Sequence, residues 1–391
     1  MAMNCIACDS ANTMPFFCMD ETPVFCNVLW PDRPHALAAP RGRIDLTWCG
    51  ACGMIFNAAF DPHLADYSPE YENSLHCSPR FQRYARQLAH ELIVRHNLRQ
   101  KTILEVGCGR GEFLTLLCDL EPNRGLGYDP SQRDSQRTTR HGLPIRIYGR
   151  PLDQTHAPGS ADLLCCRHVL EHLFSPRPFL GLLRKTLINN PHAAAFFEVP
   201  NAGRTFFGDG VWDILYEHCG YYTRSSLKAL FSRSGYHVDE LAETYEGQFL
   251  TVHASLNGKS IPPPSDDGEL QNTAAAIKTF AHRMNRQLAD WRNQLVRLER
   301  SGKRTVVWGG GSKGISFLTM LGISSHLIPY VVDLNPLKQG RFVPITGQKI
   351  VSPTFLSDYQ PQVILVMNKI YLGEIRWQIE RMGLRAELRT A

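Results

Sequence analysis

The segment at residues 212–223 gathers more titratable and aromatic side chains than any other part of the sequence. It reads WDILYEHCGYYT and follows a predicted buried strand at residues 193–199. Histidine supplies a general base near neutral pH with little tuning, so His218 is the candidate base. Glu217 could orient it or be the base itself, and three tyrosines could donate hydrogen bonds to an oxyanion: Tyr216, Tyr221 and Tyr222. The alternative is a surface loop that caps the helix predicted at residues 225–231.

A glycine-rich stretch at residues 103–113, ILEVGCGRGEF, joins an apolar strand pattern to a helical pattern. Its glycines fit a tight turn whose backbone angles a Cβ would forbid and which a ligand can approach closely. Asp129 follows about twenty residues later, at the end of a second strand-like run, where a carboxylate can accept both hydroxyls of a ribose. Glu112 stands where a dinucleotide's diphosphate would lie, which favours a cofactor without phosphate. A dinucleotide site and a purely structural turn are the alternatives.

The G-x-G-x-G spacing, preceded by Glu105 and followed by Asp129, resembles motif I and the ribose-binding position of class I methyltransferases that use S-adenosylmethionine (SAM). The resemblance implies cofactor contacts from Glu105, Gly107, Cys108, Gly109, Gly111 and Asp129. Two histidines follow a buried strand at residues 160–166, and we expect His168 and His172 in the wall of the SAM pocket. Their i, i+4 spacing could also hold a metal, but Glu171 is expected to point elsewhere and no further ligand stands out.

Two Cys-x-x-Cys pairs lie about forty residues apart near the start of the sequence. Four thiolates at this spacing predict a closed, structural zinc site, with the ligands Cys5, Cys8, Cys49 and Cys52. Four reduced, buried thiols would not explain the paired spacing. Cys18 and Cys26 lack such a partner and are interpreted as packing residues.

A second glycine loop, WGGGSKG at residues 308–314, follows a strand pattern and satisfies G-x-G-x-x-G. Asp333 ends the next apolar run, so this part predicts a small Rossmann-like unit with a third strand at residues 363–367. The loop, with Ser312 and Lys313, could hold a diphosphate of the substrate. A purely structural loop is the alternative.

Composition excludes several classes of protein. The 391 residues carry a net charge of +5 without clustered Lys or Arg, so no nucleic-acid surface stands out. The N-terminus lacks an apolar signal segment, and no run of apolar residues is long enough for a membrane span. We therefore expect a cytoplasmic protein. Its twelve cysteines are then metal ligands, buried thiols or reactive groups rather than disulfides.

The elements that must position these residues predict an α/β protein with a SAM-type Rossmann-like sheet of seven strands. The expected parts are a zinc-binding domain at 1–62, a methyltransferase domain at 75–256, a linker and long amphipathic helix at 257–302, and a C-terminal Rossmann-like domain at 303–391. The segment between the first two parts, rich in Pro, Ser and Tyr, predicts a hinge. Two of its residues, Tyr67 and Tyr71, are possible substrate contacts or simply packing residues.

This order of parts resembles the three-domain C-methyltransferases of nucleotide-linked 4-keto-deoxysugars. The resemblance implies structural zinc, SAM in the middle domain, and a sugar nucleotide between the middle and C-terminal domains. It implies that His218 removes a proton next to the ketone, with Glu217 and Tyr216 beside it and Tyr71 at the sugar. Tyr222 and Lys313 are further substrate-binding candidates.

The sequence departs from that family at two places. The enzymes usually read Tyr-His-Glu-His, whereas residues 216–218 read Tyr-Glu-His, and a His-Gly-Gly-Ser-x-Arg segment is replaced by YEGQFL at residues 245–250. The reaction class is therefore better supported than the substrate. An O-methyltransferase on a sugar or natural-product hydroxyl is the nearest alternative. An NAD-dependent oxidoreductase using the second glycine loop and a zinc-bearing scaffold without activity are the others.

Overall fold

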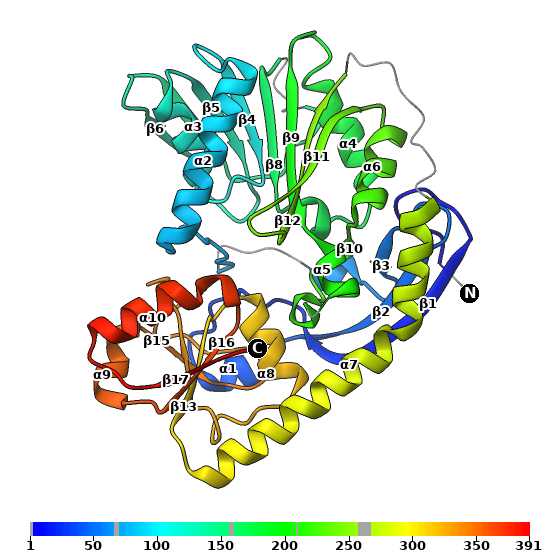
Figure 1. Ribbon diagram of the computed structural model, residues 1–391. Coiled ribbons are helices and arrows are strands. Elements are labelled where there is room, and N and C mark those ends of the chain that lie inside the picture. Colours follow the sequence, from blue (N-terminus) through cyan, green and yellow to red (C-terminus); the bar gives the residue numbers. More distant parts are fainter. Residues whose placement is uncertain (1–2, 66–69, 156–159, 209, 257–266) are drawn as a thin grey trace.

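The computed structural model contains three β-sheets among the residues that it describes, which are 3–65, 70–155, 160–208, 210–256 and 267–391 (Figure 1). In this view the eight-stranded sheet lies at the top, the four-stranded sheet at the right and the five-stranded sheet at the lower left. The predicted substrate contact Tyr67 and most of the predicted linker at 257–268 lie outside the described residues. Within them, no helix is both long and apolar enough to cross a membrane.

The N-terminal sheet is antiparallel, and its last strand comes from the middle of the chain. In sheet order it contains β1 (Thr13–Pro23), β2 (Arg41–Cys49), β3 (Ile55–Asn57) and β10 (Gly220–Tyr221). The short helices α1 (Arg33–Leu37) and η1 (Pro62–Leu64) accompany it. Because β10 begins two residues after His218, this sheet fixes one end of the loop that carries the candidate base.

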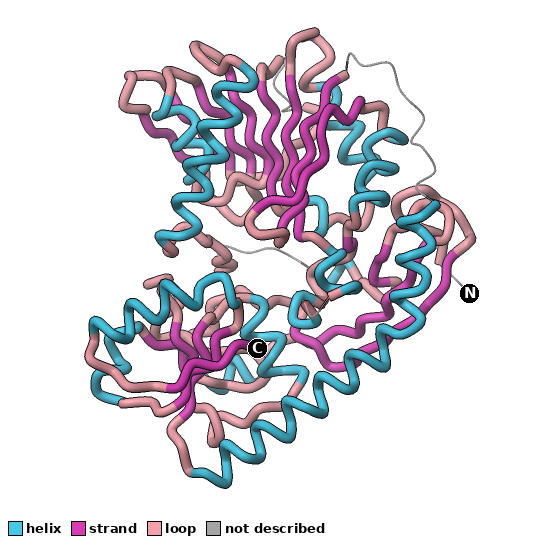
Figure 2. Tube along the Cα trace, viewed as in Figure 1, coloured by secondary structure: helices cyan, strands magenta, loops and turns pink. Residues whose placement is uncertain are grey.

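The central sheet is the large mixed sheet that the sequence predicts, with one strand more than expected. Its order is β11 (His237–Thr244), β12 (Phe249–Ser255), β9 (Ala194–Pro200), β8 (Leu163–Arg167), β4 (Thr102–Val106), β5 (Arg124–Tyr128), β7 (Pro144–Tyr148) and β6 (Ser135–Thr138). The five strands from β9 to β7 are parallel, and Figure 2 shows them side by side. The additional strand, β6, is exposed at every position, so no apolar pattern marks it in the sequence.

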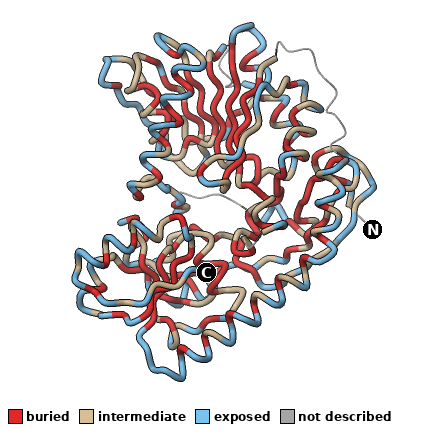
Figure 3. Tube along the Cα trace, viewed as in Figure 1, coloured by how far each residue is buried: buried red, intermediate tan, exposed pale blue. Residues whose placement is uncertain are grey.

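Helices cover the central sheet, and its inner strands β4, β8, β9 and β12 are largely buried (Figure 3). The helices are α2 (Pro79–His96), α3 (Glu112–Leu120), α4 (Pro176–Lys185) and α6 (Arg224–Arg233). The 3₁₀ turn η2 (Leu170–His172) follows β8, whereas α5 (Ala202–Phe207) and the 3₁₀ turn η3 (Val211–Asp213) pack against the helices at residues 267–301 and 312–320. Helix α2 begins where Ser78 accepts a hydrogen bond from Phe81 N, and it ends at Asn97 in the left-handed conformation. Cys18 is exposed rather than packed, whereas Cys26 is buried as expected.

The C-terminal sheet is parallel and has five strands, of which the sequence reveals three. Its order is β15 (Lys349–Val351), β14 (Tyr330–Val332), β13 (Thr305–Trp308), β16 (Val363–Val366) and β17 (Glu387–Thr390). The remaining elements are η4 (Pro353–Phe355), α8 (Ser312–Met320), α9 (Leu356–Tyr359), η5 (Lys369–Tyr371) and α10 (Leu372–Arg381). The two strands that were missed are short edge strands, and β17 carries polar residues that are not buried.

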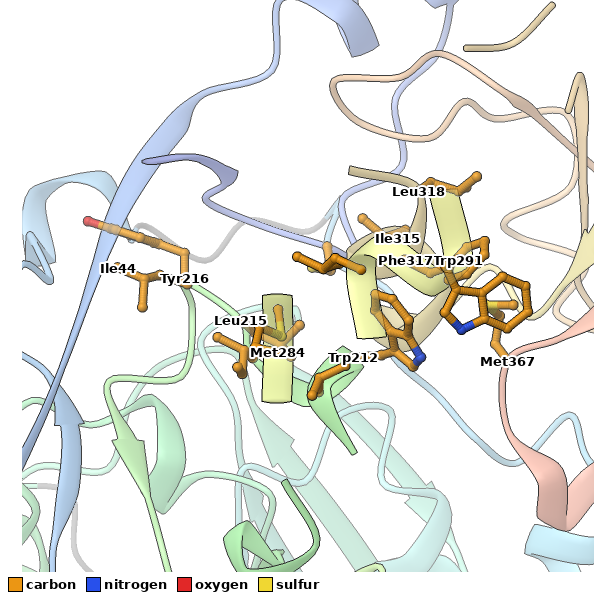
Figure 4. Close-up of a cluster of buried hydrophobic side chains, with 14 of the residues drawn as sticks. Ile44, Trp212, Leu215, Tyr216, Met284, Trp291, Ile315, Phe317, Leu318 and Met367 are labelled. Carbon is orange, nitrogen blue, oxygen red and sulfur yellow. The ribbon is translucent and has the colours of Figure 1, made fainter. Parts of the chain in front are cut away.

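The long helix α7 (Asp267–Ser301) runs from the N-terminal sheet to the C-terminal sheet, and its predicted apolar stripe is buried (Figure 1). A hydrophobic cluster joins this helix to α8, to the N-terminal sheet and to the segment before His218 (Figure 4). In it, the rings of Trp212 and Trp291 both lie 5.0 Å from that of Phe317. Burial of each such side chain contributes roughly 1.5–3 kcal/mol, so the loop of the candidate base is anchored in a shared core.

Candidate active site

The first glycine loop joins β4 to α3 with backbone angles that only glycine adopts readily. Gly107, Gly109 and Gly111 have φ angles of 74°, 51° and 72°. A Cβ on Gly107 would lie 2.1 Å from Val169 Cγ2, whereas a Cβ on Gly109 would meet nothing within 4 Å. The loop is therefore packed on one side and open on the other. Because the open face is bare backbone, it fits the close approach of a ligand.

The acidic residues predicted beside this loop lie next to it. Asp129 Oδ2 accepts a hydrogen bond of 2.8 Å from Gly109 N, which places the carboxylate at the open glycine. Glu105 is buried, its Oε2 has no hydrogen-bond partner among the described residues, and burial raises the pKa of its carboxyl to about 8. Cys108 is buried against β5, where a Cβ on Gly127 would lie 2.6 Å from its sulfur. The six predicted cofactor residues of the loop thus gather at the ends of β4 and β5.

A charged network follows β8, beside the glycine loop. Arg167 Nε and Nη2 donate to Glu198 Oε1 at 3.0 and 2.8 Å, and the Tyr84 hydroxyl donates to Glu198 Oε2. Burial disfavours the charged form of His168, but contacts with Glu171 and Glu198 outweigh it and raise its pKa to about 9. His168 has a φ of 55° and precedes η2, so it does not share one α-helical face with His172. The expectation that the two histidines lie on one face of a helical turn is therefore wrong.

His172 instead meets the candidate base. Its ring lies 4.9 Å from that of His218 at an angle of 80°, and its Nδ1 lies 3.0 Å from the carbonyl oxygen of Glu217. Burial, the neighbouring histidines and Lys313 lower the pKa of His218 well below its usual value. The imidazole of His218 is therefore unprotonated at neutral pH, which is the state that a general base requires.

Glu217 turns away from His218 toward the N-terminal part of the chain. Its Oε1 accepts a hydrogen bond of 3.0 Å from Cys26 N, and its Oε2 accepts one of 2.6 Å from the Tyr71 hydroxyl. The structure thus brings together Tyr71 and Glu217, which are 146 positions apart in the sequence. The carboxylate holds the loop of His218 against the segment that carries Tyr71.

The three tyrosines of the loop use their hydroxyls within the protein. Tyr216 accepts a hydrogen bond from Asp61 N at 2.8 Å, and Tyr222 donates one to Leu170 O at 3.1 Å. Tyr221 accepts from the nitrogen and donates to the oxygen of Leu215, at 3.0 and 2.8 Å. These contacts support a role in holding the loop. The predicted contacts of these tyrosines with an oxyanion or a substrate stay predictions.

A strap at residues 71–80 crosses between the first glycine loop and the C-terminal sheet, and sequence reasoning missed its contacts. Glu72, which is buried, accepts from Arg110 Nη2 at 3.0 Å and from Asn335 Nδ2 at 3.0 Å. Further along, the Ser74 hydroxyl donates to Glu112 Oε2 at 2.7 Å. The strap therefore links the turn of β4–α3 to the loop after β14. Only non-local contacts reveal it, since its sequence has no periodic pattern.

The second glycine loop joins β13 to α8, and the lysine within it and a lysine beside it both have partners within the protein. Gly310 N donates to Asp333 Oδ2 at 2.8 Å. Lys338, only 5% exposed, donates to Gly310 O at 3.0 Å and to Asn27 Oδ1 at 2.8 Å. Lys313, a predicted substrate contact, forms an ion pair with Asp213. The proposed use of this loop by a diphosphate stays a prediction.

The four cysteines of the two Cys-x-x-Cys pairs converge as predicted. Their sulfur atoms all lie within 4.8 Å of one another, and the pairs Cys5–Cys52 and Cys8–Cys49 are 3.6 Å apart. Gly53, with a φ of 75°, makes the tight turn after Cys52. Four thiols in this arrangement fit the tetrahedral coordination of a zinc ion.

Comparisons with known proteins cover most of the chain. Residues 79–241 match a family model described as a methyltransferase domain, and residues 266–385 match one described as a C-methyltransferase C-terminal domain. The C-methyltransferase NovU of Streptomyces niveus is 23% identical over 311 residues, which are 70% of this chain and 67% of that protein. The chain therefore carries both a methyltransferase domain and the C-terminal domain of C-methyltransferases.

Solved structures also match. A SAM-dependent methyltransferase from Clostridium acetobutylicum is 13% identical, with coverage of 46% of this chain and 92% of that chain and a TM-score of 0.35. The 1,6-didemethyltoxoflavin-N1-methyltransferase of Burkholderia thailandensis is 14% identical, with coverage of 45% and 80% and a TM-score of 0.35.

Proposed function

Because this chain is a SAM-dependent methyltransferase with the C-terminal domain of C-methyltransferases, we propose that it methylates a carbon next to a ketone, with His218 as the general base. The observation that carries the proposal is the environment of His218. Its imidazole is held against His172 in an anchored loop, and its lowered pKa keeps it unprotonated at neutral pH. A base in this state can take a proton from the carbon beside a carbonyl group.

The residues of the first glycine loop would hold SAM, which supplies an electrophilic methyl group when bound. The open backbone at Gly109 and the carboxylate of Asp129 fit the sugar part of that cofactor, and the buried Glu105 would lie beneath it. His218 removes the proton of the acceptor, and the ketone holds the negative charge that develops as an enolate. His172 keeps the ring of His218 in place, and Glu217 fixes the loop through Tyr71. Most of the rate should come from alignment and from deprotonation.

The acceptor that we propose is a nucleotide-linked 4-keto-deoxysugar or a related small molecule. The order of the three parts and the C-terminal domain support it. Residues 245–250 differ from the His-Gly-Gly-Ser-x-Arg segment of the sugar enzymes, which argues for a related acceptor rather than the same one. This turn contacts the C-terminal part of the chain, because the hydroxyls of Tyr245 and Tyr371 are 2.7 Å apart. Methylation of a hydroxyl is the second candidate, in which His218 would deprotonate an alcohol. The NAD-dependent oxidoreductase hypothesis finds no support in the matched families.

The four-cysteine cluster is proposed as a structural zinc site. All four positions would be filled by protein, so the ion would stabilise the N-terminal part and take no part in methyl transfer. We also propose the domain boundaries at 1–62, 75–256, 257–302 and 303–391. A cytoplasmic location without nucleic-acid or membrane partners is proposed as well.

The test uses labelled SAM and a panel of nucleotide-linked 4-ketosugars in deuterated water. We expect label transfer, and deuterium exchange next to the ketone even without SAM. His218→Asn should lower turnover by roughly 10²–10⁴-fold and leave SAM affinity in calorimetry unchanged. His192→Asn, at an exposed histidine, is the matched control. Normal turnover of His218→Asn would overturn the assignment of the base, and NMR of the product separates carbon from oxygen methylation.

A further inference from the structure

Three potential metal ligands from two separate segments converge beside the candidate base. Glu171 and His172 come from η2, and His218 comes from the loop before β10. One ligand atom of each residue lies within 4.8 Å of the ligand atoms of the other two. The cluster is distinct from the four cysteines and combines two imidazoles with one carboxylate. From the sequence, a metal at His168 and His172 is only an alternative to a place in the wall of the SAM pocket, and Glu171 is expected to point elsewhere. The structure instead groups Glu171 with His172 and His218.

One oxygen of the buried Glu171 carboxylate lacks a partner in the described part of the chain. The residue is 2% exposed, and its Oε2 has no hydrogen-bond partner among the described residues. Its Oε1 lies 3.5 Å from His168 Nδ1, at the long end of an ion pair. An unpaired buried carboxylate oxygen costs free energy, and a cation at this place would supply the missing interaction.

The ring of His172 is oriented as the ring of a metal-binding histidine usually is. Its Nδ1 lies 3.0 Å from Glu217 O, and since a carbonyl oxygen only accepts, Nδ1 carries the hydrogen. The lone pair of the ring is therefore on Nε2. A hydrogen bond from the other ring nitrogen to a backbone carbonyl is the usual outer support of a ligating imidazole. The ring of His218, nearly perpendicular to that of His172, supplies the second imidazole of the cluster.

We propose that Glu171, His172 and His218 form a second divalent-metal site, and that an ion bound there inhibits methyl transfer. Two nitrogen ligands and one oxygen ligand suit late first-row ions such as Zn²⁺ or Co²⁺, and three protein ligands leave a position for solvent. The inhibition rests on the proposed function, because the ion would occupy the lone pair with which His218 accepts the proton. The site itself does not depend on that function.

The binding experiment uses protein without an affinity tag, loaded with one equivalent of zinc in the four-cysteine cluster and checked by elemental analysis. Co²⁺ is then added, and both heat and visible absorption are recorded. We expect one further equivalent of Co²⁺, with d–d bands but without the intense thiolate-to-cobalt bands of a cysteine site. The substitutions E171Q, H172N and H218N should each weaken this binding by at least roughly tenfold. H192N should not change it.

A second measurement keeps the test decisive if a variant does not fold. In the unaltered protein, the imidazole nitrogens of His172 and His218 should shift in ¹⁵N NMR when Zn²⁺ is added, while those of His192 should not. The absence of a second equivalent at millimolar Co²⁺ would overturn the site. Binding that persists in both H172N and H218N would do the same.

The inhibition is tested separately. If the proposal holds, the Co²⁺ concentration that halves methyl transfer matches the dissociation constant of the second equivalent, and a chelator restores activity while the zinc of the cysteine cluster stays bound. Binding without inhibition would overturn the regulatory part. If no acceptor is methylated at all, the proposed function fails, but the calorimetric and spectroscopic results still decide the metal site.

Discussion

The two glycine loops of this chain each follow a strand and share one kind of hydrogen bond, yet they differ in glycine spacing and in the charged groups around them. In each, an aspartate at the end of the next strand accepts a loop N–H at 2.8 Å, from Gly109 to Asp129 and from Gly310 to Asp333. The first loop presents bare backbone at Gly109. In the second, a buried lysine, Lys338, donates to the loop carbonyl of Gly310.

The difference teaches that glycine spacing predicts a turn and not its ligand. The second loop fits the dinucleotide pattern better, but Lys313, the predicted phosphate contact, pairs with Asp213, and the nearby Lys338 donates to Asn27. The strands that lead into the loops differ as well. Two positions before the first glycine, β4 carries Glu105 and β13 carries Val307. The first loop alone has a titratable group at that position.

The sharpest test of the comparison replaces the two aspartates in turn. Asp129→Ala should raise the Kd of SAM by roughly 100-fold, because it removes charge-assisted hydrogen bonds worth about 3 kcal/mol in total. Asp333→Ala should leave that Kd unchanged and lower only the free energy of unfolding. Calorimetry with SAM and urea unfolding measure the two effects. Equal loss of SAM affinity in both variants would break the distinction between the loops.

The buried carboxyl before the first loop predicts a pH dependence. Burial raises the folded-state pKa of Glu105 to about 8, above its usual value of 4.5. The folded state therefore favours the protonated form, and its contribution to stability is complete below pH 4.5 and is lost as pH rises to 8. The loss is about 1.4 kcal/mol per pH unit in this window. Urea unfolding without SAM should show this slope, and Glu105→Gln should reduce it, whereas Val307→Ala should leave it in place. An unchanged slope in Glu105→Gln would contradict the assignment.

The strap tests whether the two loops are coupled. Glu72→Gln weakens the ion pair with Arg110 and keeps the amide partner Asn335 within reach. We expect a loss of about 1–2 kcal/mol in the free energy of unfolding, since one buried charge-assisted hydrogen bond becomes neutral. SAM affinity should fall together with it, because Arg110 lies between the glycines of the first loop. Glu121→Gln, at a more exposed acid, is the control. A variant with wild-type SAM affinity would show that the loops act independently.

The smallest effect is expected at a glycine of the second loop, which is best seen against a glycine of the first. Gly109→Ala meets no atom within 4 Å but forces an alanine to a φ of 51°, which costs about 1–2 kcal/mol. Gly311→Ala also meets no atom within 4 Å, and its φ of −92° suits any residue, so stability should change by less than about 0.5 kcal/mol. Thermal unfolding compares the two. A larger loss in Gly311→Ala would mean that the second loop is the more constrained one.

Local patterns predicted the parts of the site that lie close together in the sequence. An apolar run, a cluster of glycines and a helical apolar pattern predict the strand, turn and helix around Gly107. The aspartate after β5 is predicted by its place at the end of a strand. The four cysteines are marked by their pairing. Helix α7 is marked by its apolar period, which the burial of its stripe confirms.

Tertiary contacts decided the rest. The pairing of His172 with His218 depends on a 3₁₀ turn in place of an α-helical one, and a left-handed His168 breaks the expected period. Tyr71 and Glu217 meet across 146 positions, which no local pattern encodes. Strands such as β6 bury no face, so they leave no apolar signal. The domain boundaries and the roles of the site residues stay predictions.

The pairing of β10 with β3 has a consequence for the making of this protein. On the ribosome, Ile55 and Phe56 emerge early, but their partners Gly220 and Tyr221 follow only after residues 58–219. At 5–20 residues per second, this delay is roughly ten to thirty seconds. During that time the nascent chain presents an uncovered apolar edge, so it should depend on chaperones until residues 220–221 have emerged.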